Sequence, residues 1–94
     1  MAARNTTLTI PPSVWTEITD SDVSSITFQV GSQNVWVIAT DGTIPAGFDG
    51  ALFYEPRQGE VNAALADLFP GVTGATRVFV YSIYTGSKIT VSHA

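Results

Sequence analysis

The residues that could carry acid–base or metal chemistry are few in this chain. His93 is the only histidine, it lies one residue from the C-terminus, and the chain has no cysteine. A general base needs fixed partners, and chain ends are the least fixed parts of a domain. Zinc would have to rely on carboxylate and solvent ligands, which it disfavours. We therefore expect His93 to be a terminal strand residue, neither catalytic nor metal-binding.

Most of the acidic residues could in principle gather as oxygen ligands for calcium. They are Asp20, Asp22, Asp41, Asp49, Glu55, Glu60 and Asp67. No stretch shows the D-x-D-x-D-G run closed by glutamate, and turn formation explains these positions more simply. A carboxylate pair for glycoside hydrolysis needs a cleft, for which a small sandwich has little room. Nucleophile-elbow, P-loop and dinucleotide motifs do not occur. The sequence thus predicts a protein that is not an enzyme and has no cofactor.

Aromatic side chains are the more informative group. Eight of the ten are Trp15, Trp36, Phe48, Phe53, Tyr54, Phe79, Tyr81 and Tyr84. They exceed what one face of a small sheet hides, and tryptophan and tyrosine often anchor interfaces. We expect Phe28, Phe53 and Phe79 to fill the core. Trp36 and Tyr54 each adjoin residues expected to point inward, so we predict that they point outward.

The elements that position these side chains are predicted to be strands. Val, Ile, Thr and aromatic residues dominate, and Gly and Pro interrupt them about every ten residues. Ile26, Phe28 and Val30 alternate with polar residues, and a turn at 31–34 leads into an antiparallel strand at 35–40. We predict one all-β domain over 1–94, a compact antiparallel β-sandwich or barrel of about six to eight strands with one short helical turn.

Other segments are assigned in the same way. Residues 5–10 read as a strand closed by proline, so that 1–13 is an edge strand or an N-terminal arm. Segments 51–55, 75–84 and 88–94 read as strands, and Val14, Trp15 and Ile18 as possible inward anchors. Residues 61–69 fit a short helix, or equally a strand followed by one helical turn. Gly59 is the expected left-handed position of the turn before them.

The strand at 35–40 is apolar at odd and even positions alike. If Val35, Val37 and Ala39 face the core, Trp36 and Ile38 lie on the opposite face. Contiguous apolar surface of about 300 Å² or more would be unusual there for a monomer unless it served an interface. The alternative is that the Gly- and Pro-rich loop at 41–50 folds back over them. The predicted contact residues, for protein or glycan, are Trp15, Trp36, Ile38 and Tyr54.

Charge excludes several partner classes. The net charge is −4, and the four basic residues are scattered along the chain. Nucleic-acid binding requires clustered Lys and Arg, so we expect no nucleic-acid partner. No apolar run reaches the ~20 residues of a membrane span, and the first residues lack a signal-peptide core. We therefore expect no membrane partner and synthesis in the cytoplasm. Charged residues make up only 13% of the chain, which permits close subunit packing.

The runs ITFQVGSQNVWVIATDGTIPAGFDGALFY and LADLFPGVTGATRVFVYSIYTGSKITVSHA resemble small β-structured proteins encoded among the virion genes of tailed bacteriophages. The resemblance covers residues 15–94 and contains no catalytic motif. It implies a capsid decoration (cement) protein or a head-fibre protein on the capsid surface of the virion. The implied partner is the major capsid protein or another virion protein, and the working form is a homo-oligomer, with a trimer favoured. The alternative is a carbohydrate-binding module, or a tail or fibre component that contacts host glycans.

Overall fold

The computed structural model describes residues 4–83 and 85–93, and this part of the chain is almost entirely β-strand. Its elements are β1 (Arg4–Ile10), β2 (Thr16–Glu17), β3 (Ser25–Val30), β4 (Val35–Thr40), β5 (Leu52–Tyr54), β6 (Gly59–Ala64), α1 (Leu65–Leu68), β7 (Arg77–Ser82) and β8 (Ser87–His93). The all-β prediction, with eight strands and one helical turn, is confirmed. Tyr84 and the ends of the predicted segments at 1–13 and 88–94 lie outside the described residues.

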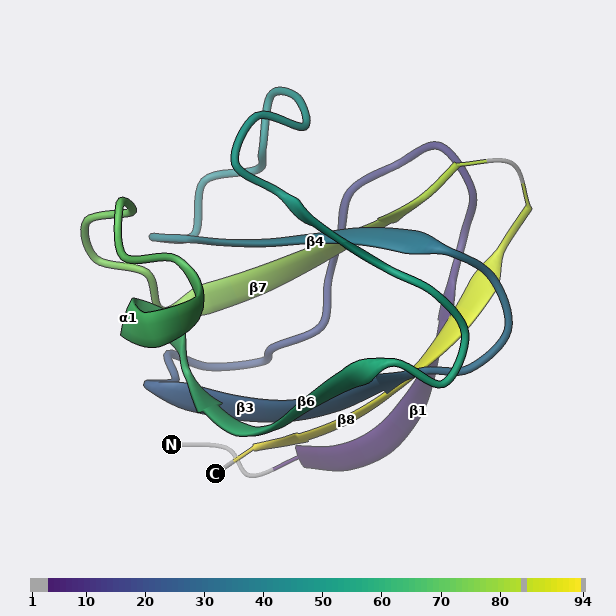
Figure 1. Cartoon of the computed structure of the whole chain (residues 1–94), viewed down its shortest axis with the longest axis horizontal. Coiled ribbons are helices and arrows are strands. Elements are labelled where there is room, and N and C mark those ends of the chain that lie inside the picture. Colours follow the sequence, from purple (N-terminus) through teal and green to yellow (C-terminus); the bar gives the residue numbers. More distant parts are fainter. Residues whose placement is uncertain (1–3, 84, 94) are drawn as a thin grey trace.

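The strands form two four-stranded antiparallel sheets that pack face to face (Figure 1). Sheet A has the order β1-β8-β3-β6, and sheet B has the order β2-β7-β4-β5. The chain is wound like one long hairpin, because β1 pairs with β8, β2 with β7, β3 with β6 and β4 with β5. This nested pairing of eight strands across two sheets is the jelly-roll arrangement.

The core lies between the sheets and follows the alternation of the strands. Phe28 in β3 is buried together with its inward neighbours Ile26 and Val30, as the sequence predicts. In β4, Val35 and Val37 face it from the opposite sheet and are also buried. Full burial of such side chains contributes about 1.5–3 kcal/mol each, so this two-layer core is the main source of stability in a chain without disulfides.

The segment at 61–69 is a strand followed by a helical turn, which is the second of the two interpretations. β6 runs into α1, whose Leu65 is buried in the core. The left-handed residue of the preceding turn is Arg57, with φ of 74°, so the prediction for Gly59 was wrong. Gly59 is required for another reason: a Cβ there would collide with the carbonyl oxygen of Phe28 in the neighbouring strand.

Candidate functional site

A row of aromatic rings crosses the outer face of sheet B. Trp36 lies in β4 directly opposite Phe53 of β5 on one side and Tyr81 of β7 on the other. The rings of Trp36 and Phe53 are 4.9 Å apart between centroids, and those of Trp15 and Tyr81 are 5.3 Å apart. Trp15 immediately precedes β2, so the row reaches all four strands of the sheet.

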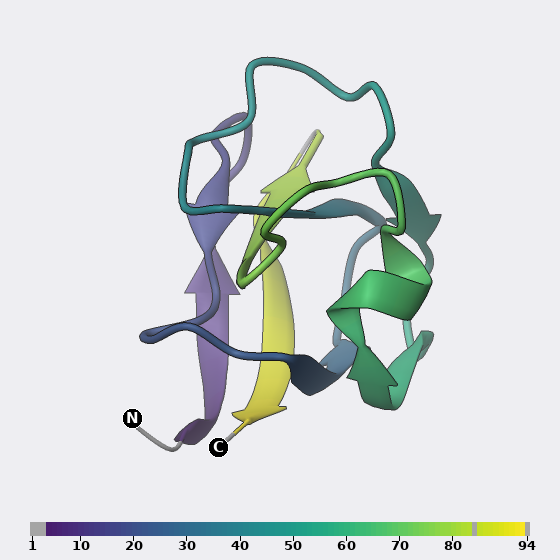
Figure 2. The ribbon, with the colours of Figure 1, turned by 90° about the vertical axis from the view of Figure 1, so that its left-hand side faces the viewer.

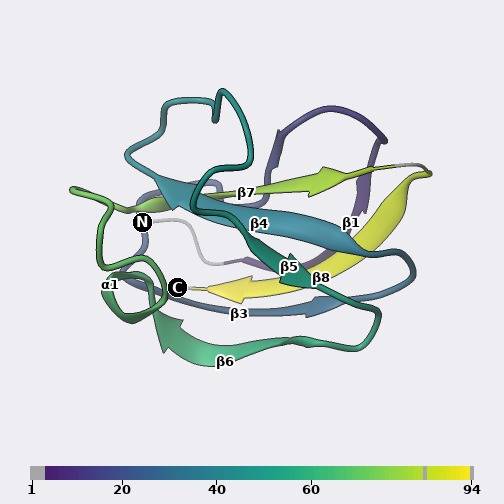
Figure 3. The ribbon, with the colours of Figure 1, turned by 45° about the horizontal axis from the view of Figure 1, so that its top comes forward.

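Phe48 lies against this row and comes from the loop between β4 and β5. That loop arches from the end of β4 back to β5 (Figure 3). Its ring is edge-on to Tyr81 at 4.8 Å and tilted against both tryptophans at 5.6 Å. We call the five rings Trp15, Trp36, Phe48, Phe53 and Tyr81 the aromatic face. Ring pairs in these tilted and edge-on geometries contribute about 0.5–1.5 kcal/mol beyond burial, so the loop is held down by specific contacts.

The local sequence of the loop explains how it returns over the sheet. Asp41 Oδ1 accepts hydrogen bonds from Thr43 Oγ1 at 2.7 Å and from Thr43 N at 3.1 Å, which closes a tight turn. These hydrogen bonds lower the pKa of Asp41. Gly42 and Gly50 take positive φ values, and Gly50 packs next to Ile38. The loop therefore covers Ile38 and part of Trp36, which confirms the alternative stated for the apolar strand at 35–40.

The loop does not cover the aromatic face completely. Phe48 remains 43% exposed and Phe53 44% exposed. Three further exposed apolar side chains belong to the same segments or flank them: Val14, Ile44 and Leu52. Among the described residues, the sixth large exposed apolar side chain is Val61 on β6, in the other sheet. Leu52 pairs with the inward-facing Val37, so the exposed apolar surface of the aromatic face itself comes from Phe48 and Phe53, and exposed rings of this kind are typical of an interaction surface.

The predicted contact residues are only partly brought together. Trp15 and Trp36 belong to the aromatic face. Of the three possible inward anchors, Ile18 is fully buried, Trp15 is partly buried against the core and Val14 is 48% exposed. Ile38 lies on the same side of β4 but is buried beneath the loop. The side of β4 that faces the core between the sheets carries Val35, Val37 and Ala39.

The prediction that Tyr54 points outward was wrong, and so was the placement of Phe53 in the core. Tyr54 pairs with Val35, whose side chain faces inward, so Tyr54 is only 7% exposed. Its ring is edge-on to Phe28 at 5.1 Å, and its hydroxyl donates a hydrogen bond to Glu60 Oε2 at 2.9 Å. Desolvation, assisted by Glu60, raises the pKa of Tyr54 well above its usual range. Phe53 takes the outward place beside Trp36.

An ionic cluster borders the aromatic face at one end. Arg77 precedes Tyr81 by four residues on β7, and it contacts Asp22 Oδ1 at 2.7 Å and Glu17 Oε2 at 2.9 Å. Hydrogen bonds to the carboxylates of Asp22 and Glu17 raise the pKa of Arg77. Because these charges satisfy one another, they give the aromatic face a polar border without adding a net positive patch.

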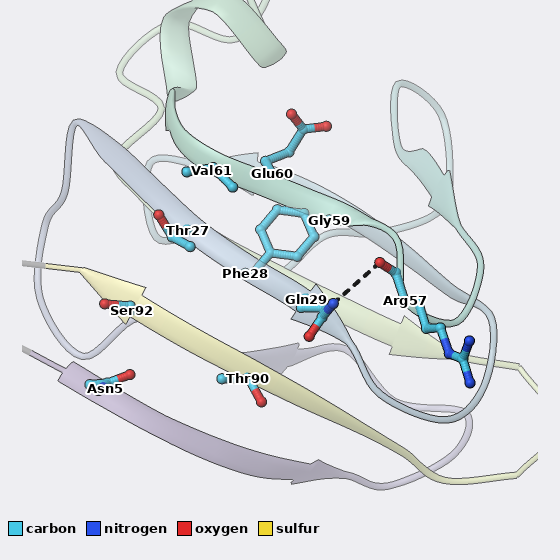
Figure 4. Close-up of a pocket in the computed structure, with 10 residues that line it drawn as sticks. All are labelled: Asn5, Thr27, Phe28, Gln29, Arg57, Gly59, Glu60, Val61, Thr90 and Ser92. Atoms are coloured by element: carbon cyan, nitrogen blue, oxygen red, sulfur yellow. Dashed lines mark hydrogen bonds between the residues drawn. The ribbon is translucent and has the colours of Figure 1, made fainter.

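The outer face of sheet A is polar and carries a groove of about 410 Å³ (Figure 4). A β-bulge at β3 and β6 shapes its floor: Asn62 has a left-handed φ of 46°, and its backbone N donates to Thr27 Oγ1 at 2.8 Å. The uncharged hydrogen-bonding groups of the lining are Asn5, Thr27, Gln29, Thr90 and Ser92. Val61 adds an apolar contact at its rim, and it is 84% exposed.

His93 and Asp20, two of the groups considered first for chemistry, contact each other. The side chain of His93 is fully buried, with Nε2 3.2 Å from Asp20 Oδ1, and neither ring nitrogen makes a well-directed hydrogen bond. Arg4 Nε holds the other oxygen of Asp20 at 3.1 Å. In the described part of the chain, no three His, Cys, Asp or Glu residues are grouped as a metal site would require. No helix within residues 4–83 or 85–93 has the length and apolar character to span a bilayer.

Comparison with known proteins adds no relative. No protein-family model, no curated protein and no solved structure matches the chain. The site is therefore defined by its own geometry: an aromatic face on sheet B that is partly covered by a loop, and a groove on sheet A that is lined by uncharged polar side chains together with Arg57 and Glu60.

Proposed function

We propose that the chain is a non-enzymatic virion structural protein that binds a capsid surface, as a decoration (cement) protein does. The observation that carries the proposal is the aromatic face, where Phe48 and Phe53 stay more than two-fifths exposed. Aromatic residues are enriched in the buried centres of protein interfaces. Jelly rolls build viral capsid domains and also lectins, and this analogy at the level of the fold supports the proposal.

The chemistry of the exposed rings favours a protein partner over a sugar. The two most exposed rings of the aromatic face are phenylalanines, which offer no hydrogen bond. The tryptophans and Tyr81 that could stack on a sugar are half-buried, with Phe48 against them. An exposed apolar patch of this kind is complementary to an apolar patch on another protein.

Photo-crosslinking tests the proposal directly. Benzoylphenylalanine in place of Phe53 is expected to crosslink to a virion shell protein in cells that assemble the virions. The matched control is benzoylphenylalanine in place of Val61, which is exposed on the other sheet. Crosslinks to a shell protein from position 53 and not from position 61 would support capsid decoration. No shell-protein crosslink from position 53, or equal crosslinking from both, would contradict it.

A second variant separates loss of binding from loss of fold. Phe53→Ser is expected to reduce co-sedimentation of the purified chain with purified shells, because it removes an exposed ring at the edge strand β5. Trp36→Ser is a poorer choice, since Trp36 supports both Phe48 and Phe53. Circular dichroism should show that Phe53→Ser remains folded.

Carbohydrate binding is the second candidate, and two observations favour it. Four rings form a row across sheet B, and the groove on sheet A offers neutral hydrogen-bonding groups. Nuclear magnetic resonance titration of the chain with glucose, galactose and N-acetylglucosamine oligomers would reveal it. Chemical-shift changes confined to Trp36 and Phe53, or to Thr27 and Gln29, would support a glycan function on that surface. No change at millimolar sugar, together with a shell crosslink from position 53, would exclude it.

A further inference from the structure

The four sheet edges differ in how well they are protected against pairing with another strand. In sheet B, β2 has two residues and β5 has three. In sheet A, β6 is interrupted by the bulge and by the left-handed Asn62. Short length and bulges are devices that prevent edge-to-edge association. The remaining edge, β1, has neither: its seven residues pair with β8 in unbroken register from Arg4 to Ile10 (Figure 2).

The residues of β1 do not protect its edge either. The strand RNTTLTI contains no lysine, no acidic residue, no proline and no glycine. Its only charge, Arg4, contacts Asp20 at 3.1 Å and the carbonyl oxygen of Ile18 at 3.2 Å, at the end of the strand. Thr6, Thr7 and Thr9 are exposed and neutral. Among the described residues, the backbone of β1 has a neighbouring strand on one side only, so its other side presents N–H and C=O groups that no described strand pairs with.

We propose that two copies of the chain associate through their β1 strands, antiparallel to each other about a two-fold axis. The combined sheet then has the order β6-β3-β8-β1-β1-β8-β3-β6. A second copy is the occupant because β1 is the one long regular edge that a copy can offer in return. The contact is isologous and uses the open edge of both copies, so association stops at the dimer and does not continue into a fibre.

The sequence of β1 is self-complementary in this orientation. With Thr7 opposite Thr7 of the second copy, Arg4 lies opposite Ile10 and the two arginines are at opposite ends of the contact. A parallel pairing would instead bring the two Arg4 side chains together, and like charges directly opposite are destabilising. The proposed assembly is two-fold, unlike the trimer that the resemblance favours. It involves sheet A, whereas the proposed capsid contact uses sheet B, so the two proposals can fail independently.

Thr7 is the position that tests the contact. Thr7→Lys places two like charges opposite each other at the two-fold axis, on a residue that is exposed in one subunit. Thr90→Lys is a matched control, because Thr90 is the neighbour of Thr7 on β8 and shares its hydroxyl contact at 3.0 Å. Both variants therefore lose the same hydrogen bond, and they differ only in their distance from the proposed dimer contact.

The measurement is mass by light scattering and sedimentation velocity on the full chain, from about 1 µM to about 1 mM. Wild type and Thr90→Lys are expected to reach twice the 10.0 kDa of one chain. Thr7→Lys should weaken dimerisation by about tenfold or more at low salt, and an equimolar mixture with Thr7→Glu should restore it. Circular dichroism verifies the fold of each variant.

Several results would overturn the proposal. One is a wild-type mass that stays at 10.0 kDa over the whole range, and another is three times that mass. Equal dimerisation of Thr7→Lys and Thr90→Lys would also refute it. So would a dimer that is lost in Phe53→Ser and retained in Thr7→Lys, because the contact would then be the aromatic face.

Discussion

Removing the Phe48 ring is the most direct test of how the aromatic face is built. Phe48 is 43% exposed, so a little over half of its surface is covered by the tryptophans, Tyr81 and the loop. A phenylalanine buries on the order of 200 Å² when fully covered, so Phe48→Ala removes about 110 Å² of buried apolar surface. At about 25 cal/mol per Å², Phe48→Ala should lower the free energy of unfolding by about 2–3 kcal/mol.

Urea and thermal unfolding of Phe48→Ala provide the measurement. For a domain of this size, the expected loss corresponds to a decrease in Tm of about 10–20 °C. The chain has two tryptophans and both contact Phe48, so their folded-state emission should also shift to longer wavelength. Circular dichroism at low temperature should still report the native fold, because Phe48 lies outside the core between the sheets.

Ile44→Ala is the matched control for this prediction. Ile44 belongs to the same loop but is 69% exposed, so its removal should change the free energy of unfolding by no more than about 0.5 kcal/mol. If Phe48→Ala costs no more than Ile44→Ala and leaves the emission unchanged, then the loop does not lie on the aromatic face and the description of the site fails.

Three further predictions concern the framework of the sandwich. Gly59→Ala should destabilise the chain by about 3 kcal/mol or more, because its Cβ would meet the Phe28 carbonyl, whereas Gly47→Ala, with open space around it, should be nearly neutral in urea unfolding. Thr19→Val should cost about 1–3 kcal/mol, since it leaves the buried Val78 N–H without its acceptor at 3.2 Å; a value close to that of Thr19→Ser would contradict this role. The pKa of Tyr54 is higher in the folded chain than in the unfolded chain, so the neutral side chain stabilises the fold fully below about pH 10. Above that pH the free energy of unfolding should fall by at most ~1.4 kcal/mol per pH unit. Urea midpoints at pH 9 to 11 should therefore fall more steeply for wild type than for Tyr54→Phe, and parallel slopes would disprove the assignment.

The fold could be predicted because its determinants are local. Alternation in β3 and the turn at 31–34 locate two strands, and the same reasoning finds most of the other strands. The prediction that these two strands form a hairpin was wrong, because β3 pairs with β6 and β8 in sheet A whereas β4 pairs with β5 and β7 in sheet B, so residues 31–34 connect the two sheets. The order of strands could not be predicted, since nested pairing joins residues as distant as Arg4 and His93. Pairs that distant leave no periodic signal in the sequence.

The candidate site likewise has one feature that the sequence predicts and one that it does not. Adjacent strand residues must point to opposite sides, so one of Phe53 and Tyr54 had to face outward. Which of them does so is decided by register, because pairing with Val35 turns Tyr54 inward. That choice could have been made from the hairpin of β4 and β5 if the loop between them had been short. With a loop from 41 to 51, the register is set by tertiary contacts such as those of Phe48.

The two proposals together have a consequence for binding strength. A two-fold axis through β1 runs perpendicular to the extended sheet A, because paired residues such as Thr7 keep their side chains on the same face. Both copies of sheet B then lie on the same side, and both aromatic faces are presented in one direction. A capsid surface repeats its binding sites, so a dimer that spans two of them binds with an effective concentration that a single aromatic face lacks. Two aromatic faces of modest area would then be enough for stable binding of the dimer to the shell. Thr7→Lys should therefore weaken shell binding, even though Thr7 does not touch the shell.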